Sequence, residues 1–290
     1  MKLLVRHQTI YRYSAVAGRV AMRLKLMPVD TPTQTVLDWQ VSINDVPLTG
    51  FRRNSYGEME ATWISHERLD HAVIVAEGLV DTRESHGVVG HLDSRVDPRY
   101  FLRDTPLTEA SDAIVAMARA LPAGDGPLAQ LHALSAAVWD AVRYRAGVTN
   151  SGTTAAQAFA LGAGVCQDHA QIFIAAARTL GRPARYVSGY LLAGDGDALH
   201  ETHGWAEAHV PGLGWIGFDP SNQVCVTERY LRLASGLDAD DAAPIRGSVT
   251  IMGDIWIDAD VRIAQAEDGV EERQLQRQQQ QSIPPPDPQD

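Results

Sequence analysis

The stretch Gly162-Ala163-Gly164-Val165-Cys166-Gln167-Asp168-His169 places a single cysteine between a glycine-rich loop and the start of a predicted helix. The expected helix continues to Leu180 and ends at Gly181, a typical stop signal. A cysteine at a helix N-terminus lies beside unpaired backbone N–H groups and the positive end of the helix dipole, and both stabilise the nucleophilic thiolate. Position alone still favours the ordinary alternative, in which Cys166 is a small buried side chain.

The composition is that of a globular protein and excludes several classes of function. The 290 residues carry a formal net charge of −11, so binding to a nucleic-acid backbone has no electrostatic support. Only two cysteines occur, Cys166 and Cys225, which argues against a disulfide framework. The N-terminal apolar run is too short for a signal peptide, and no apolar stretch reaches about 18 residues. We therefore expect a cytoplasmic protein that binds neither nucleic acid nor membrane; the oligomeric state stays open.

The character of the sequence changes three times along the chain. Residues 1–84 alternate polar and apolar side chains without a helical period, which predicts an N-terminal antiparallel β-sandwich domain. Residues 85–106 are rich in Gly, Pro and charged side chains and are expected to form a linker. Residues 107–265 contain helical segments followed by strands, so we expect an α+β core with C-terminal strands. The Gln- and Pro-rich tail, residues 266–290, is expected to be disordered.

A cysteine nucleophile needs a base, and the base needs an orienting group. His203 begins a predicted strand, and a glycine-containing loop joins this strand to another that ends in Asp219. If Val210 paired with Trp215, His203 and Asp219 would lie on opposite faces of the sheet. If Val210 pairs with Gly214, Asp219 becomes a diagonal neighbour of His203 on the same face. We predict this second register, because the two side chains can then act together with the cysteine.

Several motifs resemble the bacterial transglutaminase-like superfamily, and the resemblance covers about residues 1–265. In the core the motifs are Gly164-Val165-Cys166-Gln167-Asp168, Pro183-Ala184-Arg185-Tyr186-Val187-Ser188-Gly189-Tyr190, His203-Gly204-Trp205-Ala206-Glu207 and Trp215-Ile216-Gly217-Phe218-Asp219-Pro220. Three further motifs resemble the β-rich N-terminal domain that often precedes this core in bacteria. They are His7-Gln8-Thr9-Ile10-Tyr11-Arg12-Tyr13-Ser14, Leu24-Lys25-Leu26-Met27-Pro28 and Asn54-Ser55-Tyr56-Gly57. One more motif resembles the segment that follows the core in this family, namely Asp241-Ala242-Ala243-Pro244-Ile245-Arg246-Gly247.

This resemblance implies a papain-like core, in which helices pack on an antiparallel sheet, and a Cys-His-Asp triad. Residue by residue, it gives Cys166 as the nucleophile, His203 as the base and Asp219 as the orienting acid. Two positions depart from the usual pattern. His169 stands where an aromatic residue such as Phe is more common, and His209 stands where Tyr is often found.

Neighbours of the triad are expected to line a substrate pocket. The candidates are Gln167, His169, Trp205 and Tyr190, whereas the other aromatic side chains of these strands, Tyr186 among them, are expected in the core. No side chain before Cys166 is an obvious donor for an oxyanion. The backbone N–H of Cys166 is therefore the first choice for that donor and Gln167 the second.

The sequence gives no strong signal for a metal or another cofactor, and we expect none. His200-Glu201-Thr202-His203 suggests zinc, but it is one residue short of the His-Glu-x-x-His motif and falls where a strand is expected. Asp238, Asp240 and Asp241 are more simply a solvated loop than a calcium site. Cys225 is expected to be a structural or surface thiol.

The triad supports acyl transfer through a thioester on Cys166, with a peptide or protein as the substrate. Water as the acceptor would make the protein a peptidase or amidase, and an amine would make it a transglutaminase. The third possibility is an inactive papain-like scaffold that only binds. The compact bacterial form and the absence of calcium-type loops favour hydrolysis of a peptide or isopeptide.

Overall fold

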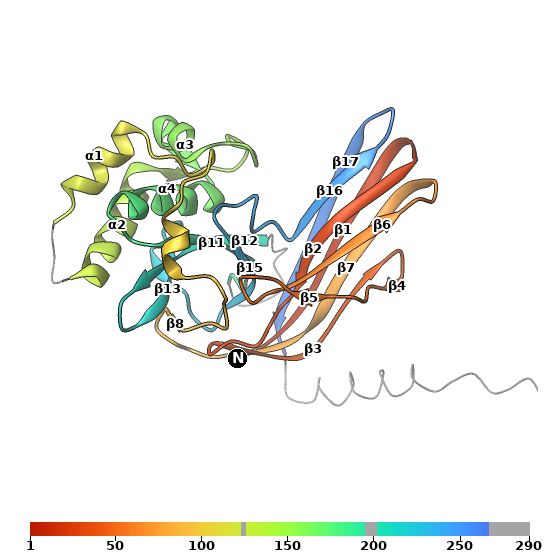
Figure 1. Cartoon of the computed structure of the whole chain (residues 1–290), viewed down its shortest axis with the longest axis horizontal. Helices are drawn as coiled ribbons and strands as arrows, with labels where there is room; N and C mark the ends of the chain where they lie inside the picture. The colour runs from red at the N-terminus through yellow and green to blue at the C-terminus, as the bar shows by residue number, and fades with distance from the viewer. Residues whose placement is uncertain (123–125, 195–201, 267–290) are drawn as a thin grey trace, which may run out of the picture.

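The computed structural model describes residues 1–122, 126–194 and 202–266, which form two halves side by side (Figure 1). One half consists of two β-sheets, and the other combines helices with an antiparallel sheet. This arrangement confirms the expected α+β fold class, with a β-domain joined to a transglutaminase-like core. All of the predicted disordered tail except residue 266 lies outside the described residues.

The β-domain consists of one sheet of order β17-β1-β7-β3-β4 and a second of order β16-β2-β6-β5. Side chains at every second position, such as Val5, Met22 and Ile74, are buried in one common apolar cluster. The alternation seen in the sequence thus becomes the inner face of each sheet. The strands encoded by the first 84 residues are β1 (Lys2–Ala17), β2 (Arg19–Met27), β3 (Gln34–Ile43), β4 (Val46–Pro47), β5 (Arg52–Arg53), β6 (Met59–Ser65) and β7 (Leu69–Thr82).

The last two strands do not extend the core, as their assignment to residues 107–265 assumed. Strand β16 (Ile245–Thr250) pairs with β2, and β17 (Ile255–Gln265) pairs with β1 along eleven residue pairs. Each becomes the edge strand of one sheet of the β-domain. Strands β1 and β2 offer free edges that only a distant segment can cover, so local patterning gives no sign of this pairing. The β-domain is therefore built from both ends of the described chain.

The core places helices against a sheet of order β14-β13-β12-β11-β15, to which β8 (Val88–Gly90) adds beside β13. Its helices are the 3₁₀-helix η1 (Pro98–Leu102), α1 (Asp112–Ala120), α2 (Pro127–Ala141), α3 (Ala155–Leu161) and α4 (Cys166–Thr179). Its sheet strands are β11 (Ala184–Leu191), β12 (Thr202–Val210), β13 (Gly214–Asp219), β14 (Val224–Cys225) and β15 (Tyr230–Gly236), and β9 (Arg143–Tyr144) pairs separately with β10 (Ala163–Gly164). Within the described residues, no helix is long and apolar enough to cross a membrane.

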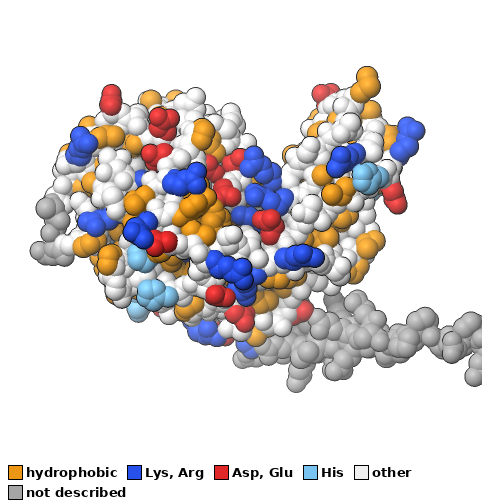
Figure 2. Space-filling view, viewed as in Figure 1, with side chains coloured by type: hydrophobic (Ala, Val, Ile, Leu, Met, Phe, Trp, Pro, Cys, Tyr) orange, Lys and Arg blue, Asp and Glu red, His pale blue; other side chains and the backbone are white. Residues whose placement is uncertain are grey.

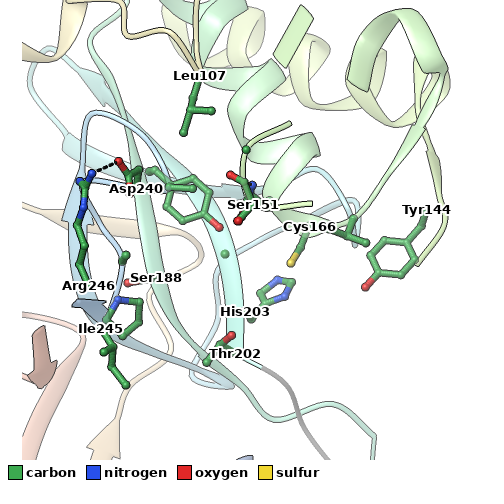
Figure 3. Close-up of a pocket in the computed structure, with 18 residues that line it drawn as sticks. Leu107, Tyr144, Ser151, Cys166, Ser188, Thr202, His203, Asp240, Ile245 and Arg246 are labelled. Atoms are coloured by element: carbon green, nitrogen blue, oxygen red, sulfur yellow. Dashed lines mark hydrogen bonds and ion pairs between the residues drawn. The ribbon is translucent and has the colours of Figure 1, made fainter. Parts of the chain in front are cut away.

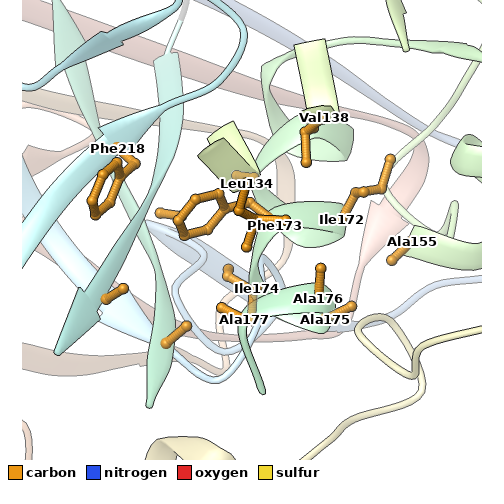
Figure 4. Packing of buried hydrophobic residues seen from close by; sticks show 14 of the residues in the cluster. Leu134, Val138, Ala155, Ile172, Phe173, Ile174, Ala175, Ala176, Ala177 and Phe218 are labelled. Carbon is orange, nitrogen blue, oxygen red and sulfur yellow. The ribbon is translucent and has the colours of Figure 1, made fainter. Parts of the chain in front are cut away.

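Helix α4 is the centre of this core. Every side chain from Asp168 to Arg178 is buried, and the helix lies among α1, α2, α3 and the sheet (Figure 4). The run Ala175–Ala177 lets neighbouring elements approach closely, whereas Phe173 fills the space toward the sheet and stacks on Phe218 at 5.1 Å between ring centroids. A helix packed on all sides has little freedom to shift. The core therefore fixes the position of the first residue of α4, Cys166.

A buried ion-pair network joins the two halves. Glu58 of the β-domain accepts a hydrogen bond from Arg232 of β15 at 2.9 Å, and Arg232 also contacts Glu207 of β12 at 3.2 Å. Glu207 is bound in turn by Arg185 of β11 at 2.5 Å. None of these four side chains is more than 5% exposed. Since removing one partner from a buried ion pair costs about 3–5 kcal/mol, the network holds the halves in one fixed arrangement.

Candidate active site

The glycine-rich loop brings Cys166 to the start of α4 by a short pairing. Gly162 ends α3 with a left-handed φ of 65°, and strand β10 then runs parallel to β9. A Cβ on Gly164 would lie only 2.5 Å from Asp168 Oδ2, so no larger residue fits there without displacing this carboxylate. Asp168 in turn accepts hydrogen bonds from the Val165 N–H at 2.8 Å and from Thr149 at 2.7 Å. The glycine thus allows the carboxylate to cap the helix that carries the cysteine.

The hairpin of β12 and β13 has the register that the sequence predicted. Val210 pairs with Gly214 and Ala206 pairs with Phe218, which leaves Asp219 beside the strand segment that begins at His203. His203 Nε2 lies 2.6 Å from Asp219 Oδ2. The predicted register is therefore confirmed, and the two side chains meet on the same side of the sheet.

The carboxylate of Asp219 is buried and surrounded by donors. Ser221 donates from its backbone N–H at 3.0 Å and its hydroxyl at 2.6 Å, Asn222 donates at 2.7 Å, and the Tyr230 hydroxyl donates at 2.8 Å. Burial alone would raise the pKa of Asp219, but the hydrogen bond and charge of His203, with the other donors, hold that pKa below its ordinary value. Asp219 is thus a fixed negative charge against the imidazole.

His203 is the charged partner of this carboxylate. Burial alone would lower the pKa of His203, but hydrogen bonds and charge from Asp219 and Cys166 raise it well above the ordinary value. The ring stacks on Trp205 at 6.3 Å between centroids and is flanked by Tyr230. Because Nε2 is engaged by Asp219, Nδ1 is the nitrogen left for Cys166. Figure 3 shows the Cys166 sulfur pointing toward the His203 ring.

A pocket of about 710 Å³ opens at Cys166 and His203. Gln167 is also part of its wall and donates to the Ser151 carbonyl at 3.3 Å. The remaining lining comes from both halves of the molecule, since the β-domain side supplies the run 244–246. Figure 2 shows the hollow between the halves, with Lys and Arg side chains gathered along it. The other lining residues are Leu107, Tyr144, Gly152, Val165, Tyr186, Ser188, Thr202, Gly204, Ala239, Asp240 and Ala243.

Three residues that the sequence placed in the pocket are buried elsewhere. His169 is fully buried, and its two ring nitrogens contact the carbonyls of Val142 at 2.8 Å and Val165 at 2.9 Å. The residue that departs from the usual Phe is therefore a tether between the end of α2 and the start of α4. Trp205 lies beneath the His203 ring and is 2% exposed, so it supports the ring without lining the pocket.

Tyr190 is the third residue. The sequence analysis placed Tyr190 in the pocket and Tyr186 in the core, and the structure shows the reverse. Tyr190 is fully buried among residues of the β-domain, where its hydroxyl contacts His7 Nδ1 at 2.9 Å. Tyr186, which was expected in the core, lines the pocket. Both lie on the same face of β11, but this strand runs from beneath α4 toward the β-domain, so only Tyr186 reaches the cysteine. Sequence alternation alone does not separate the two.

The partners of Asp219 were also missed by the sequence interpretation. The signal for two of them was present, because Ser221 and Asn222 follow Asp219-Pro220 directly, and short polar residues after a strand commonly fold back on a carboxylate. Cys225 lies in β14 as a free thiol whose pKa is raised by burial. His200 and Glu201, which suggested zinc, lie outside the described residues. The described residues contain no group of His, Cys, Asp and Glu side chains arranged to hold a metal.

Comparison with known families finds a match in each half of the chain. Residues 115–220 match the Transglutaminase-like superfamily, and residues 3–81 match the Bacterial transglutaminase-like N-terminal region. The chain combines a transglutaminase-like core with a bacterial transglutaminase-like N-terminal domain. The first of these two ranges contains Cys166, His203 and Asp219.

Similar proteins extend along nearly the whole transglutaminase-like chain. An uncharacterized protein of Mycobacterium tuberculosis is 27% identical, and the match covers 84% of this chain and 86% of the relative. An uncharacterized protein of Mycobacterium leprae is 25% identical over 90% of this chain and 98% of its own length. A crystal structure titled as a candidate cysteine protease from Cytophaga hutchinsonii has a TM-score of 0.73 at 23% identity and covers 92% of this chain and 91% of its own. That similarity shows the fold.

Proposed function

We propose that this protein is a cysteine hydrolase that cleaves an amide bond in a peptide or isopeptide through a thioester on Cys166. The observation that carries the proposal is the line Cys166–His203–Asp219 at the pocket, with His203 bonded to Asp219 at 2.6 Å. The raised pKa of His203 favours an imidazolium, which stabilises a thiolate beside it. Asp219 holds the ring in place and supports its charge.

In the first half of the reaction, the Cys166 thiolate attacks the carbonyl carbon of the substrate amide. The carbonyl π electrons move to oxygen, which carries the negative charge of a tetrahedral intermediate. When the intermediate collapses, the carbon–nitrogen bond breaks and His203 gives its proton to the leaving amine. The products of this half are a free amine and an acyl thioester on Cys166.

In the second half, His203 removes a proton from water as the water oxygen attacks the thioester carbonyl. Collapse of the second intermediate breaks the carbon–sulfur bond, releases a carboxylic acid and restores the thiolate beside the imidazolium. An amine that replaced water at this step would turn hydrolysis into transglutamination. We favour water as the acceptor because of the compact bacterial form of the chain and the absence of calcium-type loops from its sequence. A cytoplasmic location also stays a prediction.

The first test asks whether Cys166 is an activated nucleophile. Iodoacetamide alkylation at graded pH, read by peptide mass spectrometry, compares Cys166 with Cys225 in the same molecule. We expect Cys166 to react at a lower pH, because His203 stabilises its thiolate whereas burial raises the pKa of Cys225. A His203→Gln variant should lose this advantage. Equally slow alkylation of both thiols would support a non-catalytic scaffold.

The second test separates the two acceptors. The full chain is incubated with a mixture of peptides, with and without an added primary amine, and the products are identified by mass spectrometry. Hydrolysis yields free carboxylic acids in both samples. A product heavier by the amine, formed at the expense of the acid, would assign transglutaminase activity instead. A Cys166→Ala variant should yield neither product.

A further inference from the structure

The hydroxyl of Tyr186 has no hydrogen-bond partner within the described part of the chain, although the side chain is only 6% exposed. The comparable hydroxyls of Tyr190 and Tyr230 are engaged, by His7 at 2.9 Å and Asp219 at 2.8 Å. The Tyr186 oxygen is not among the fully buried unpaired polar atoms of the described residues, so it is open to the pocket and available to a partner there. The Tyr186 ring belongs to the pocket wall that contains Cys166 and His203.

The sequence makes room for this hydroxyl beside the histidine. A Cβ on Gly204 would lie 1.7 Å from the Tyr186 oxygen, so the hydroxyl lies directly against the backbone of the residue that follows His203. Any other residue at position 204 would push the hydroxyl away. Strand pairing sets Gly204 opposite Ser188 and Tyr186 opposite Ala206, and these small neighbours leave the phenol ring without a competing side chain.

The electrostatic surroundings keep Tyr186 protonated. Burial raises the pKa of the phenol, and the negative charges of Cys166, Asp168 and Asp219 raise it further. The side chain is therefore an O–H donor throughout the pH range in which a cysteine enzyme works.

The start of helix α4 supplies a second free donor to the pocket. Cys166 is the first residue of α4, and its backbone N–H has no partner within the described residues, as expected for the first turn of a helix. The residues that carry these two donors, one on the helix and one on the sheet, line the same pocket as His203. Two donors on one oxygen are the usual composition of an oxyanion hole.

We propose that Tyr186 is a catalytic residue that donates its O–H to the substrate carbonyl oxygen, as the second donor of an oxyanion hole whose first donor is the Cys166 N–H. This inference rests on the proposed acyl transfer. When the thiolate attacks, the carbonyl electron pair moves to oxygen and the resulting anion accepts both hydrogen bonds. Tyr186 keeps its proton, since the proton needed by the leaving amine comes from His203.

The test uses two reactions of the same thiol in the full-length Tyr186→Phe variant. Acylation by p-nitrophenyl acetate passes through a tetrahedral anion, whereas alkylation by iodoacetamide is a displacement at a saturated carbon and forms no oxyanion. We expect the acylation rate to fall roughly 100-fold, which is the usual effect of removing one oxyanion donor, and the alkylation rate to stay within about twofold. Phenylalanine keeps the ring and its packing, and thermal unfolding checks that the fold is retained.

The matched control is Tyr190→Phe, which removes a buried hydroxyl from the same face of the same strand but outside the pocket. Both reactions of this variant should match the unmodified protein. Unchanged acylation in Tyr186→Phe would overturn the inference. An equal loss in both reactions would also overturn it, because Tyr186 would then act on the thiolate. If the unmodified protein reacts with neither reagent at Cys166, the proposed function itself fails.

Discussion

Replacing Asp219 with Asn is expected to lower the pKa of His203 by up to about three units. The two charges lie on atoms 2.6 Å apart, but the imidazolium charge is spread over its ring, so an effective separation of roughly 4 Å is appropriate. At an effective dielectric constant of about 20, this separation gives about 4 kcal/mol, and each pKa unit corresponds to about 1.4 kcal/mol. Asparagine keeps the size of the side chain and one oxygen acceptor, but its NH2 group cannot accept the hydrogen bonds that a second carboxylate oxygen receives, so the charge is lost together with some of these bonds.

The assay is an NMR titration of the histidine Cε1 resonances in both proteins, with the His203 signal assigned by its loss in His203→Gln. His209, whose pKa is lowered chiefly by burial and by the charges of His91 and Arg185, is the internal control and should titrate identically in both. The direction of the shift also fixes the effect on stability. Because the folded pKa of His203 is raised, its contribution is fully present below the unfolded value of about 6.5 and is lost as pH rises through the folded value.

In Asp219→Asn the alkaline loss of stability should therefore begin at a lower pH than in the unmodified protein. A His203 midpoint that moves by less than about half a unit would refute the reasoning, because the carboxylate would then contribute little of the charge stabilisation assigned to it. A shift at His209 of the same size would show instead that the substitution disturbs the fold.

Two further predictions concern the architecture that holds the site. Glu58→Gln leaves Arg232 with one carboxylate instead of two, so urea unfolding should show a loss of about 3 kcal/mol, the lower end of the cost of breaking a buried pair. Glu77→Gln, which breaks the half-buried pair with Arg6, should cost less than about 1 kcal/mol, and equal effects of the two variants would contradict the role of burial. Gly164→Ala forces Asp168 away from the start of α4 and should slow alkylation of Cys166 on the order of tenfold or more. In the control Gly18→Ala, the added Cβ meets no atom closer than 4.0 Å, so the alkylation rate should be unchanged. A normal rate in Gly164→Ala would show that the helix cap does not position the thiol.

The parts of the site that local sequence determines could be predicted. Turn residues and strand alternation within about 15 residues determine the glycine-rich loop, the helix after it and the register of the hairpin. Cys166, His203 and Asp219 could therefore be identified from the sequence and predicted to lie close together. Alternation assigns a residue to a face of the sheet but does not say what covers that face. This is why Tyr186 and Tyr190, both on one face of β11, were exchanged.

Contacts between distant segments were beyond such reasoning. Nothing near residues 245–265 indicates that they pair with β1 and β2, because the free edges they cover lie more than 200 residues earlier in the chain. His169 shows a related limit. A polar residue at a position where Phe is common suggested that His169 lines the pocket. In the structure its two ring nitrogens face backbone carbonyls, which only the packing of α2 against α4 brings within reach.

The β-domain is best understood as a fixed wall of the active site. After the core is complete, the chain crosses the pocket at residues 244–246 and returns to the β-domain as strand β16. Glu58 anchors this domain to Arg232, whose other partner, Glu207, lies three residues beyond Gly204 on the strand that carries His203. A core separated from the β-domain would expose Arg232 and lose the pocket wall at Ile245. The pocket at Cys166 is therefore formed by the two halves together, and we expect a substrate to enter along the hollow between them.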